Sequence, residues 1–303
     1  MAPDQEKERL VSQSGNRISA RRVVAIVTHE SRDSVISSAH SFRNSLRAVG
    51  IDARIVASRR EVEALRNLEL VVVIGGDGTI LKAAELVRGM SVPIMGINYG
   101  HVGFLAEVDP SSQAEVVAAI VARKWSVEQR MTLDVVVRLP SGEEIGSWAL
   151  NEVSIEKGPG SRMIETDIGV DGKPVSSFKT DCVLLSTPTG STAYNFSAGG
   201  PIVWPDVEAI VLTPVAAHAL FTRPMVVGPS SWLEVQIRAD DAMLWCDGRR
   251  KISAPVGATV RAQRGKHPVY LARLSDAPFS ERLVKKLQLP VHGWRAGAKN
   301  AEV

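Results

Sequence analysis

The sequence predicts an α/β unit with a doubly wound parallel sheet at residues 21–129, followed by a β-rich, sandwich-like unit at 130–276. In the first half, apolar runs alternate with segments of helical periodicity, which is typical of parallel strands joined by helices. After Trp125 the pattern changes to short strands of alternating polarity. Their connecting turns are rich in Pro, Gly and Asp, which is typical of antiparallel sheets.

The α/β unit opens with residues 21–29, a continuous apolar run with β-branched residues that predicts a buried strand. Segment 31–50 carries apolar residues at helical spacing and ends at Gly50, a typical helix stop. The other expected strands are 51–58, 68–76 and 92–100, and the other expected helices are 59–67, 78–89 and 111–124.

The β-rich unit contains two hairpin signals, "PSGEE" and "VDGKP". Beyond it, residues 277–295 are expected to carry a helix that packs back onto the α/β unit. Residues 1–20 are polar and are expected to form a disordered tail.

The composition excludes several classes of protein. The chain has 303 residues, and its 36 basic and 33 acidic residues give a net charge of +3, too weak a bias to indicate a nucleic-acid partner. No apolar run approaches the roughly 20 residues that cross a bilayer, and the N-terminus lacks an apolar signal core, so no membrane partner is expected. Cys182 and Cys246 are expected to be buried thiols in a reducing cytoplasm. No metal-ligand spacing of His or Cys occurs.

The first candidate site is the turn "GGDGT", which follows an expected parallel strand and precedes an expected helix. Open α/β sheets bind ligands at this end of their strands, and a helix N-terminus favours an anion. Two roles are open for Asp77. It could cap the helix through the N–H of Thr79 or Ile80, or it could take the proton from a substrate hydroxyl beside a phosphate. The predicted phosphate loop is Gly75, Gly76, Gly78 and Thr79.

Two further segments combine polar groups in the β-rich unit. Asn151 and Glu152 precede an apolar strand and are interpreted either as an exposed polar pair or as a site that recognises ribose or base. Segment 186–201, "STPTGSTAYNFSAGGP", is dense in hydroxyls and small residues and carries Tyr194, which indicates a nucleotide-binding loop rather than a plain hairpin. A nucleophilic serine is not expected, because no GxSxG turn occurs.

Together these motifs resemble the bacterial NAD kinases and are most similar to actinobacterial members. The shared segments "GGDGT", "NYGHVGFLAE", "LNEVSIEKG", "FKTDCVLLSTPTGSTAYNFSAGGPI" and "WCDGR" occur in the family's order over about residues 22–295. The resemblance implies an NAD kinase/diacylglycerol kinase-like fold. It also implies transfer of a phosphoryl group from ATP, or from inorganic polyphosphate as in some relatives, to the 2′-hydroxyl of the adenosine ribose of NAD. Mg²⁺ that arrives with the nucleotide and a homodimer or homotetramer are implied as well.

The resemblance assigns Asp77 as the catalytic base and places Gly78 and Lys82 beside the dinucleotide. Arg249, which follows "CDG", is a further candidate. The other NAD-binding residues that it implies are Asn151, Glu152, Arg162, Lys179, Asp181, Thr189, Thr192, Ala193, Tyr194, Asn195, Phe196 and Ser197.

Two residues depart from the family's pattern. Cys182 stands where many members have glycine, and its small size is expected to leave Asp181 in place. His101 stands where many members have arginine and removes a permanent charge. Two alternative functions remain, a lipid kinase of the same superfamily and a non-catalytic dinucleotide-binding module. The polar segment 186–201 argues against the first, and the presence of Asp77 argues against the second.

Overall fold

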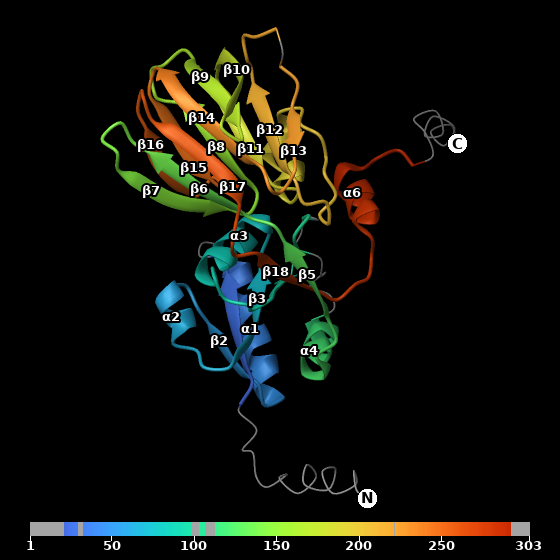
Figure 1. The fold of residues 1–303 in the computed structure, drawn as a ribbon. Coiled ribbons are helices and arrows are strands. Elements are labelled where there is room, and N and C mark those ends of the chain that lie inside the picture. Colours follow the sequence, from blue (N-terminus) through green and yellow to red (C-terminus); the bar gives the residue numbers. More distant parts are fainter. Residues whose placement is uncertain (1–20, 30–32, 98–102, 107–112, 221, 292–303) are drawn as a thin grey trace, which may run out of the picture.

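The structure, a computed structural model, describes residues 21–29, 33–97, 103–106, 113–220 and 222–291. The predicted tail at 1–20 and the departure at His101 lie outside these residues. Two units are stacked end to end, with the α/β unit below and the β-rich unit above in Figure 1.

The first unit is built on a six-stranded sheet with the order β2-β1-β3-β4-β18-β5. The first five strands in this order run parallel, and β5 is antiparallel to β18. The strands are β1 (Val23–Thr28), β2 (Asp52–Ile55), β3 (Leu68–Ile74), β4 (Ile94–Ile97), β5 (Ser126–Arg130) and β18 (Val269–Arg273).

Helices cover both faces of this sheet, so the predicted doubly wound arrangement is confirmed. Phe42 and Ile120 pack with Val72 of β3 in one buried cluster. Val62 and Ile80 belong to a second cluster, built on the alternate residues of the same strands. The helices are α1 (Asp33–Ala48) and α4 (Gln113–Ala122) on the first side, and α2 (Arg59–Glu63) and α3 (Asp77–Leu86) on the second.

The second unit is a sandwich of two six-stranded antiparallel sheets, as predicted. Leu133, Val135 and Val137 are buried at alternate positions of one sheet and share a core with Val153 and Ile155 of the other. The first sheet contains β10 (Lys173–Thr180), β9 (Ile164–Val170), β14 (Trp232–Ala239), β17 (Thr259–Arg264), β6 (Leu133–Arg138) and β7 (Glu144–Ala149), in this order. The second contains β13 (Met225–Val227), β12 (Ile210–Val215), β11 (Cys182–Ser186), β8 (Glu152–Lys157), β15 (Ala242–Cys246) and β16 (Arg250–Ala254).

One strand lies in a different sheet from the one expected. Residues 269–273 were predicted as part of the β-rich unit at 130–276, but β18 lies between β4 and β5 in the sheet of the α/β unit. Val269 and Leu271 enter one core cluster of that unit and Ala272 enters the other, so β18 is buried on both faces. A strand's sequence pattern reports that it is buried but does not report which sheet buries it.

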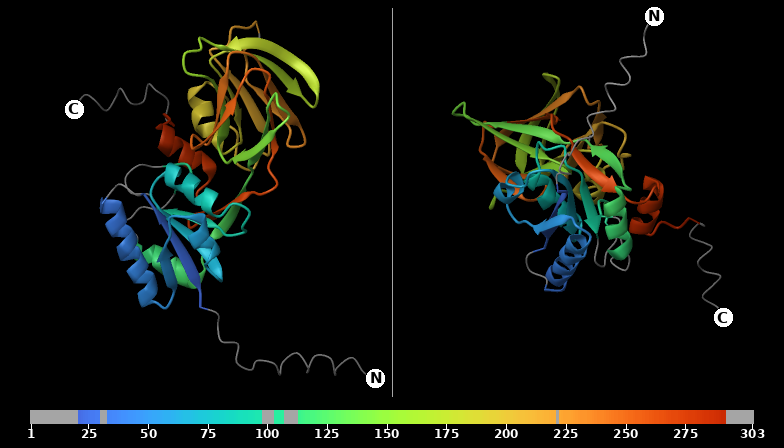
Figure 2. Two further views of the ribbon diagram at one scale, coloured as in Figure 1. Left: turned by 90° about the vertical axis from the view of Figure 1, so that its left-hand side faces the viewer. Right: turned by 90° about the horizontal axis from the view of Figure 1, so that it is seen from below.

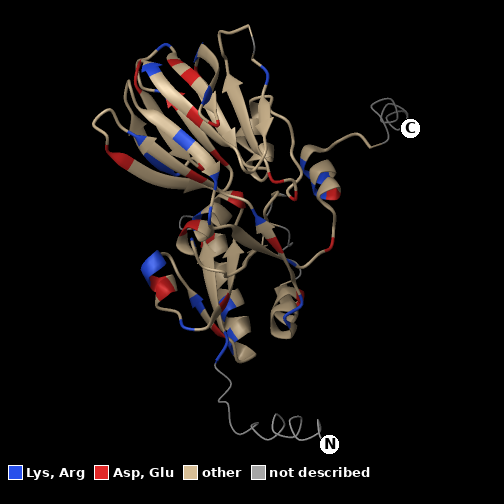
Figure 3. Ribbon diagram, viewed as in Figure 1, with Lys and Arg blue, Asp and Glu red and all other residues tan. Residues whose placement is uncertain are grey.

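Three short helices complete the described chain: the 3₁₀ helix η3 (Gly190–Thr192), α5 (Tyr194–Ser197) and α6 (Phe279–Leu287). Helix α6 lies beside the junction of the two units in Figure 1 and in the left view of Figure 2. Basic and acidic residues, coloured blue and red on the ribbon of Figure 3, are interspersed along both units. No helix among the described residues combines the length and the apolar character needed to cross a membrane.

Candidate functional site

The predicted phosphate loop connects β3 to α3. Gly75 has φ of 153°, and a Cβ there would lie 2.6 Å from Thr79 Oγ1, so this position requires glycine. Gly76 is the N-cap of α3 and, like Gly78, is exposed. The helix therefore opens with accessible backbone N–H groups and the positive end of its dipole, a suitable place for a phosphate.

The Asp77 carboxylate makes neither of the two helix-cap bonds considered from the sequence. The N-cap of α3 is Gly76, which has no side chain to cap with. Instead, Asp77 Oδ2 accepts the N–H of Phe104 at 3.0 Å, and Oδ1 accepts those of Leu105 and Ala106 at 3.1 and 3.4 Å. A Cβ on Gly103 would lie 2.2 Å from Oδ1, so this close approach also depends on glycine.

These hydrogen bonds determine which lone pair of the Asp77 carboxylate is left to accept a further proton. A carboxylate oxygen has two lone pairs, and among the described residues Oδ1 accepts two N–H groups while Oδ2 accepts one. The half-buried side chain therefore keeps one acceptor position on Oδ2.

Asn151 and Glu152 lie at the start of β8, and they are not the exposed pair that was considered from the sequence. Glu152 is 9% exposed, and its Oε2 has no hydrogen-bond partner within the described chain. Burial raises the pKa of the Glu152 carboxyl to about 8, and the neighbouring Asp247 carboxylate adds to this rise, while the N–H of Tyr194 opposes it. Glu152 is therefore a protonated, neutral group at neutral pH and can donate a hydrogen bond.

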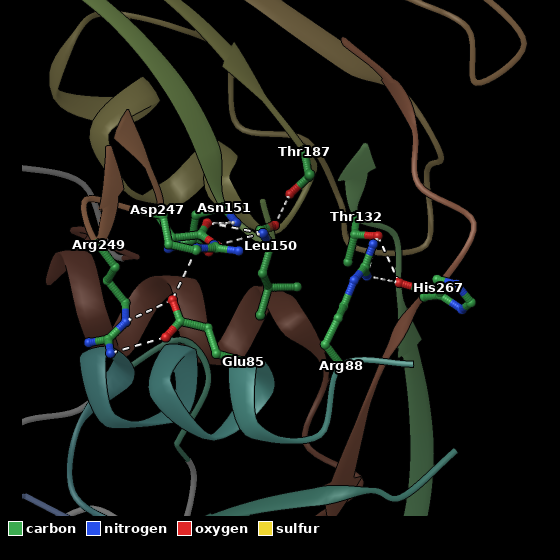
Figure 4. Close-up of polar contacts among 10 residues, drawn as sticks. Glu85, Arg88, Thr132, Leu150, Asn151, Thr187, Asp247, Arg249 and His267 are labelled. Atoms are coloured by element: carbon green, nitrogen blue, oxygen red, sulfur yellow. Dashed lines mark hydrogen bonds and ion pairs between the residues drawn. The ribbon is translucent and has the colours of Figure 1, made fainter. Parts of the chain in front are cut away.

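Asp247 holds this pair in place, and sequence reasoning missed it. Its Oδ1 accepts the N–H of Asn151 at 2.7 Å, and both of its oxygens accept the N–H of Leu150 at 3.0 Å (Figure 4). Arg250 Nη2 donates to Oδ2 at 2.6 Å. The "DG" pair within "WCDGR" was the available signal, because Asp247 and Gly248 form a tight hairpin turn with φ of 55° and 62°.

The same turn reaches the helix that carries Asp77. Arg249, expected as a nucleotide contact, pairs with Glu85 of α3 at 3.0 Å (Figure 4). Arg250 Nε lies 3.1 Å from the same carboxylate. Lys82 is half-buried on α3, one turn before Glu85.

Segment 186–201 divides into buried and exposed residues. Asn195 is fully buried, and its amide donates to Ser191 O and Pro201 O while accepting from Thr213 Oγ1, so this side chain supports the loop. The expected nucleotide contact of Asn195 stays a prediction. Thr189 is buried, and Thr192 and Ala193 are half-buried. The exposed residues of the segment are Tyr194, Phe196, Ser197, Gly199 and Pro201.

The loop meets the Asn151–Glu152 pair at the C-terminal end of β11, where Ser186 pairs with Glu152. Thr187 N–H donates to Asn151 O at 2.9 Å, and Thr187 Oγ1 donates to Leu150 O (Figure 4). A Cβ on Gly190 would lie 2.0 Å from Asn151 O, so the loop packs directly against this backbone. The structure therefore brings segment 186–197 together with the start of β8.

Arg162, Lys179 and Asp181 lie at the opposite end of these strands. Cys182 pairs with Glu156, whereas Ser186 pairs with Glu152, so β11 separates the two groups by roughly 13 Å. Asp181 pairs with Lys157 at 2.8 Å, and Lys179 lies 3.7 Å from Glu165. Within one copy of the chain, these residues lie away from Asn151 and Glu152, but the Tyr194 side chain of the loop reaches Cys182 and interacts with Asp181.

Both cysteines are buried and free, as expected. Burial raises the pKa of the Cys182 thiol, so this residue is an inert replacement for glycine beside Asp181. Within the described residues, no group of three or more His, Cys, Asp or Glu is arranged to hold a metal ion.

Two family models match the chain, one for each half. Residues 8–125 match the ATP-NAD kinase N-terminal domain, and residues 150–274 match the ATP-NAD kinase C-terminal domain. The chain belongs to the ATP-NAD kinase family.

Relatives and solved structures of this family agree with the match. The chain is 45% identical to an NAD kinase of Thermobifida fusca, covering 91% of this chain and 92% of the relative. It is 50% identical to an NAD kinase of Mycolicibacterium paratuberculosis over 84% and 83% of the two chains. The fold matches an Archaeoglobus fulgidus NAD kinase in complex with ATP, with a TM-score of 0.71, 27% identity and coverage of 88% and 98%. Yeast NADH kinase complexed with NADH matches with a TM-score of 0.82 at 21% identity, over 89% and 88%, which shows the shared fold. The lipid-kinase and non-catalytic alternatives receive no support.

Proposed function

We propose that this NAD kinase transfers the terminal phosphoryl group of ATP to the 2′-hydroxyl of the adenosine ribose of NAD, with Asp77 as the general base. The observation that carries the proposal is the orientation of the Asp77 carboxylate by three backbone N–H groups at the N-terminus of α3. The position left on Oδ2 accepts the ribose proton. The hydroxyl oxygen then bonds to phosphorus while the bond to ADP breaks, giving NADP and ADP.

The exposed backbone N–H groups of Gly76 and Gly78 bind the phosphates, and the start of β8 binds the ribose. Glu152 donates a hydrogen bond to a ribose oxygen or a ring nitrogen of the base, because its carboxyl is neutral at neutral pH. Asn151 both donates and accepts. Tyr194, with 40% of its surface exposed, offers a ring face to the base.

We propose that the divalent ion is Mg²⁺, carried by the nucleotide. The donor set fits this role, since the described residues contain no cluster of acidic or His side chains that would hold an ion by itself. Such an ion neutralises charge on the transferred phosphoryl group. Inorganic polyphosphate is a second donor that the same exposed N–H groups would accommodate, and competition between ATP and polyphosphate at saturating NAD distinguishes the two.

The direct test replaces Asp77 by Asn, which preserves the shape of the side chain and removes its basicity. We expect NAD binding to persist and turnover to fall by about 10² to 10⁴-fold, the usual contribution of general-base catalysis. NADP formation from NAD, ATP and Mg²⁺ is measured with an NADP-specific dehydrogenase, and NAD binding by calorimetry. Full turnover in Asp77→Asn would remove Asp77 from this role.

We further propose a homodimer or homotetramer located in the cytoplasm. Val226 is an exposed apolar residue of the edge strand β13, which offers a surface suited to pairing with a second copy, and Leu220 before this strand is exposed as well. A second copy would also offer its Asp181, which lies away from the start of β8 within one chain. Sedimentation analysis of the wild type and of Val226→Lys tests the assembly. The reduced, buried cysteines suit a reducing compartment.

A further inference from the structure

Helix α6 contacts the segment that holds the Asp77 carboxylate. Phe104, whose N–H donates to Asp77 Oδ2, places its ring against Phe279 of α6, with 6.2 Å between the ring centroids. Phe279 is the first residue of the helix and is half-buried. The residue that makes the aromatic contact is therefore itself a hydrogen-bond donor to the candidate base.

Phe279 also contacts the β-rich unit. The ring of Trp204 meets it edge to face, with 5.1 Å between the centroids. Trp204 follows Val203, whose N–H donates to Ser191 Oγ at 2.9 Å and whose carbonyl accepts from the same hydroxyl. Phe279 thus lies between the segment that orients Asp77 and the loop that carries Tyr194.

A second, polar contact acts on the same segment. Arg273, at the end of β18, is 2% exposed and donates from Nη1 to the carbonyl of Leu105 at 2.8 Å. Its Nε donates to Glu128 at 2.9 Å, and Arg282 of α6 lies 3.6 Å from the same carboxylate. Burial favours the neutral form of Glu128, but Arg273 and Arg130 outweigh it and lower its pKa to about 2, so the cluster stays charged.

Among the described residues, helix α6 is held in part by its own aromatic, arginine and leucine side chains. Leu283 is its buried residue, and Phe279 and Arg282 supply the contacts described above. A cavity of about 560 Å³ adjoins the helix and is lined in part by Phe279, Arg282 and Trp204. Because Phe279 contacts Phe104 directly, loss of its ring would act on the Gly103–Ala106 segment.

We propose that Phe279 is a positioning residue for the phosphoryl transfer: wedged between Phe104 and Trp204, and supported by the Arg273–Glu128–Arg282 cluster, it fixes the backbone N–H groups that aim Asp77 at the substrate. The proposal rests on the proposed role of Asp77 as the base. It adds that a side chain of the last helix, outside the nucleotide site, sets the geometry of that base.

The test compares Phe279→Ala with Phe279→Tyr, which keeps the ring. Val284→Ala is the matched control, because it truncates an apolar residue of the same helix that points away from Phe279 by roughly 140°. Hydrogen exchange of the Phe104, Leu105 and Ala106 amides is measured by mass spectrometry without substrate, and kcat and KM are measured separately. We expect Phe279→Ala to speed the exchange of these amides and to lower kcat by roughly tenfold or more, since sub-ångström misplacement is costly, with little change in the KM for NAD.

Phe279→Tyr and Val284→Ala should retain the wild-type exchange and kcat. Unchanged exchange at 104–106 in a folded Phe279→Ala overturns the proposal, and so does faster exchange spread evenly over the chain, which would indicate a general stabilising role. If Phe279→Ala does not fold, Trp204→Ala replaces it in the test, because it removes the ring on the other side of Phe279. This variant should also speed amide exchange at 104–106 and lower kcat. Hydrogen exchange is measured without turnover. A failure of the Phe279 proposal is therefore distinguishable from a failure of the proposed role of Asp77, which the turnover of Asp77→Asn tests.

Discussion

The position of Gly103 explains how a carboxylate can sit in a phosphate-binding turn. Because Gly103 has no side chain, the backbone can close over Asp77. Three N–H groups then compensate the negative charge of the Asp77 carboxylate, which would otherwise repel a bound phosphate. The glycines of the loop and the glycine facing it thus serve different purposes. Gly76 and Gly78 leave room for a ligand, and Gly103 leaves room for Asp77.

Gly103→Ala should therefore impair catalysis without unfolding the chain. The added Cβ would lie 2.2 Å from Asp77 Oδ1, so the carboxylate or the segment must move. We expect kcat to fall on the order of 10²-fold, the cost of a displacement near 1 Å. Steady-state kinetics measure this. Gly146→Ala is the control, because nothing lies within 4 Å of a Cβ there; equal losses in both variants would contradict the argument.

Glu152 predicts a pH dependence of stability with a definite sign. Its pKa rises from 4.5 in the unfolded chain to about 8 in the folded one, so its stabilising contribution is complete below the lower value and is lost as the pH rises toward the upper one. Each pH unit between them costs up to about 1.4 kcal/mol.

Glu152→Gln removes this titration. We expect the unfolding free energy of the variant, relative to wild type, to increase between about pH 5 and about pH 8, as followed by urea denaturation of the ligand-free protein. The exposed Glu143→Gln serves as the control. A difference between Glu152→Gln and wild type that stays constant with pH would show that Glu152 is ionised in the folded protein.

At the scale of elements, the β15–β16 turn acts as a clamp on the start of β8. Asp247→Asn replaces one carboxylate oxygen by an NH₂ group that must face either a backbone N–H or Arg250, both of which are donors. We expect a loss of about 1–3 kcal/mol in stability, the usual cost of an unsatisfied buried group. NAD binding, measured by calorimetry, should weaken as Asn151 and Glu152 shift.

Asp171→Asn is a close control for this clamp. Asp171 also has a positive φ, of 50°, in a hairpin turn, and its carboxylate accepts the N–H of Trp232 at 2.9 Å. It belongs to the β9–β10 turn, outside the nucleotide site. NAD affinity should stay unchanged in Asp171→Asn. A similar loss of NAD affinity in both variants would show that the hold of Asp247 on the start of β8 does not support ligand binding.

The elements also show what the sequence can and cannot predict. The β3–turn–α3 unit and the "VDGKP" hairpin follow from local signals, and both form as predicted. The partners of Asp77 and of Arg249 lie 27 to 29 and 164 residues away in the chain, respectively. Local patterns carry no information on such pairs. The roles of Gly103 and Asp247 follow from these long-range contacts, and so does the structural use of the Asn195 side chain.

At the scale of the whole molecule, the two units are joined through Trp148. The Arg88 guanidinium lies 4.2 Å from the centre of its ring and that of Arg250 lies 4.3 Å away. Trp148 belongs to β7 of the sandwich, yet it packs on a core cluster of the α/β unit. Arg88, which follows α3, also donates to Thr132 at 3.1 Å and to Asp134 at 2.8 Å (Figure 4 shows Arg88 and Thr132).

Trp148→Leu should uncouple the units. We expect the wild type to unfold in one calorimetric transition and the variant to lose about 2 kcal/mol or more and to separate into two, because each cation–π contact and the buried ring area stabilise the junction. Trp232→Leu is the control, since Arg261 lies 3.8 Å from its ring within one sheet of the sandwich. One shared transition in both variants would contradict this account.

The placement of β18 has a consequence for how the protein is made. The sheet of the first unit needs residues 269–273 between β4 and β5, and these residues follow the whole sandwich in the chain. A ribosome therefore releases the strands β1 to β5 long before the strand that completes their sheet, and the whole sandwich is synthesised in the interval. Until that point β4 presents an open edge, and the sandwich must fold while its neighbour is still unfinished. Any shortened product that ends before Val269 lacks the strand between β4 and β5, so its first unit cannot complete its sheet.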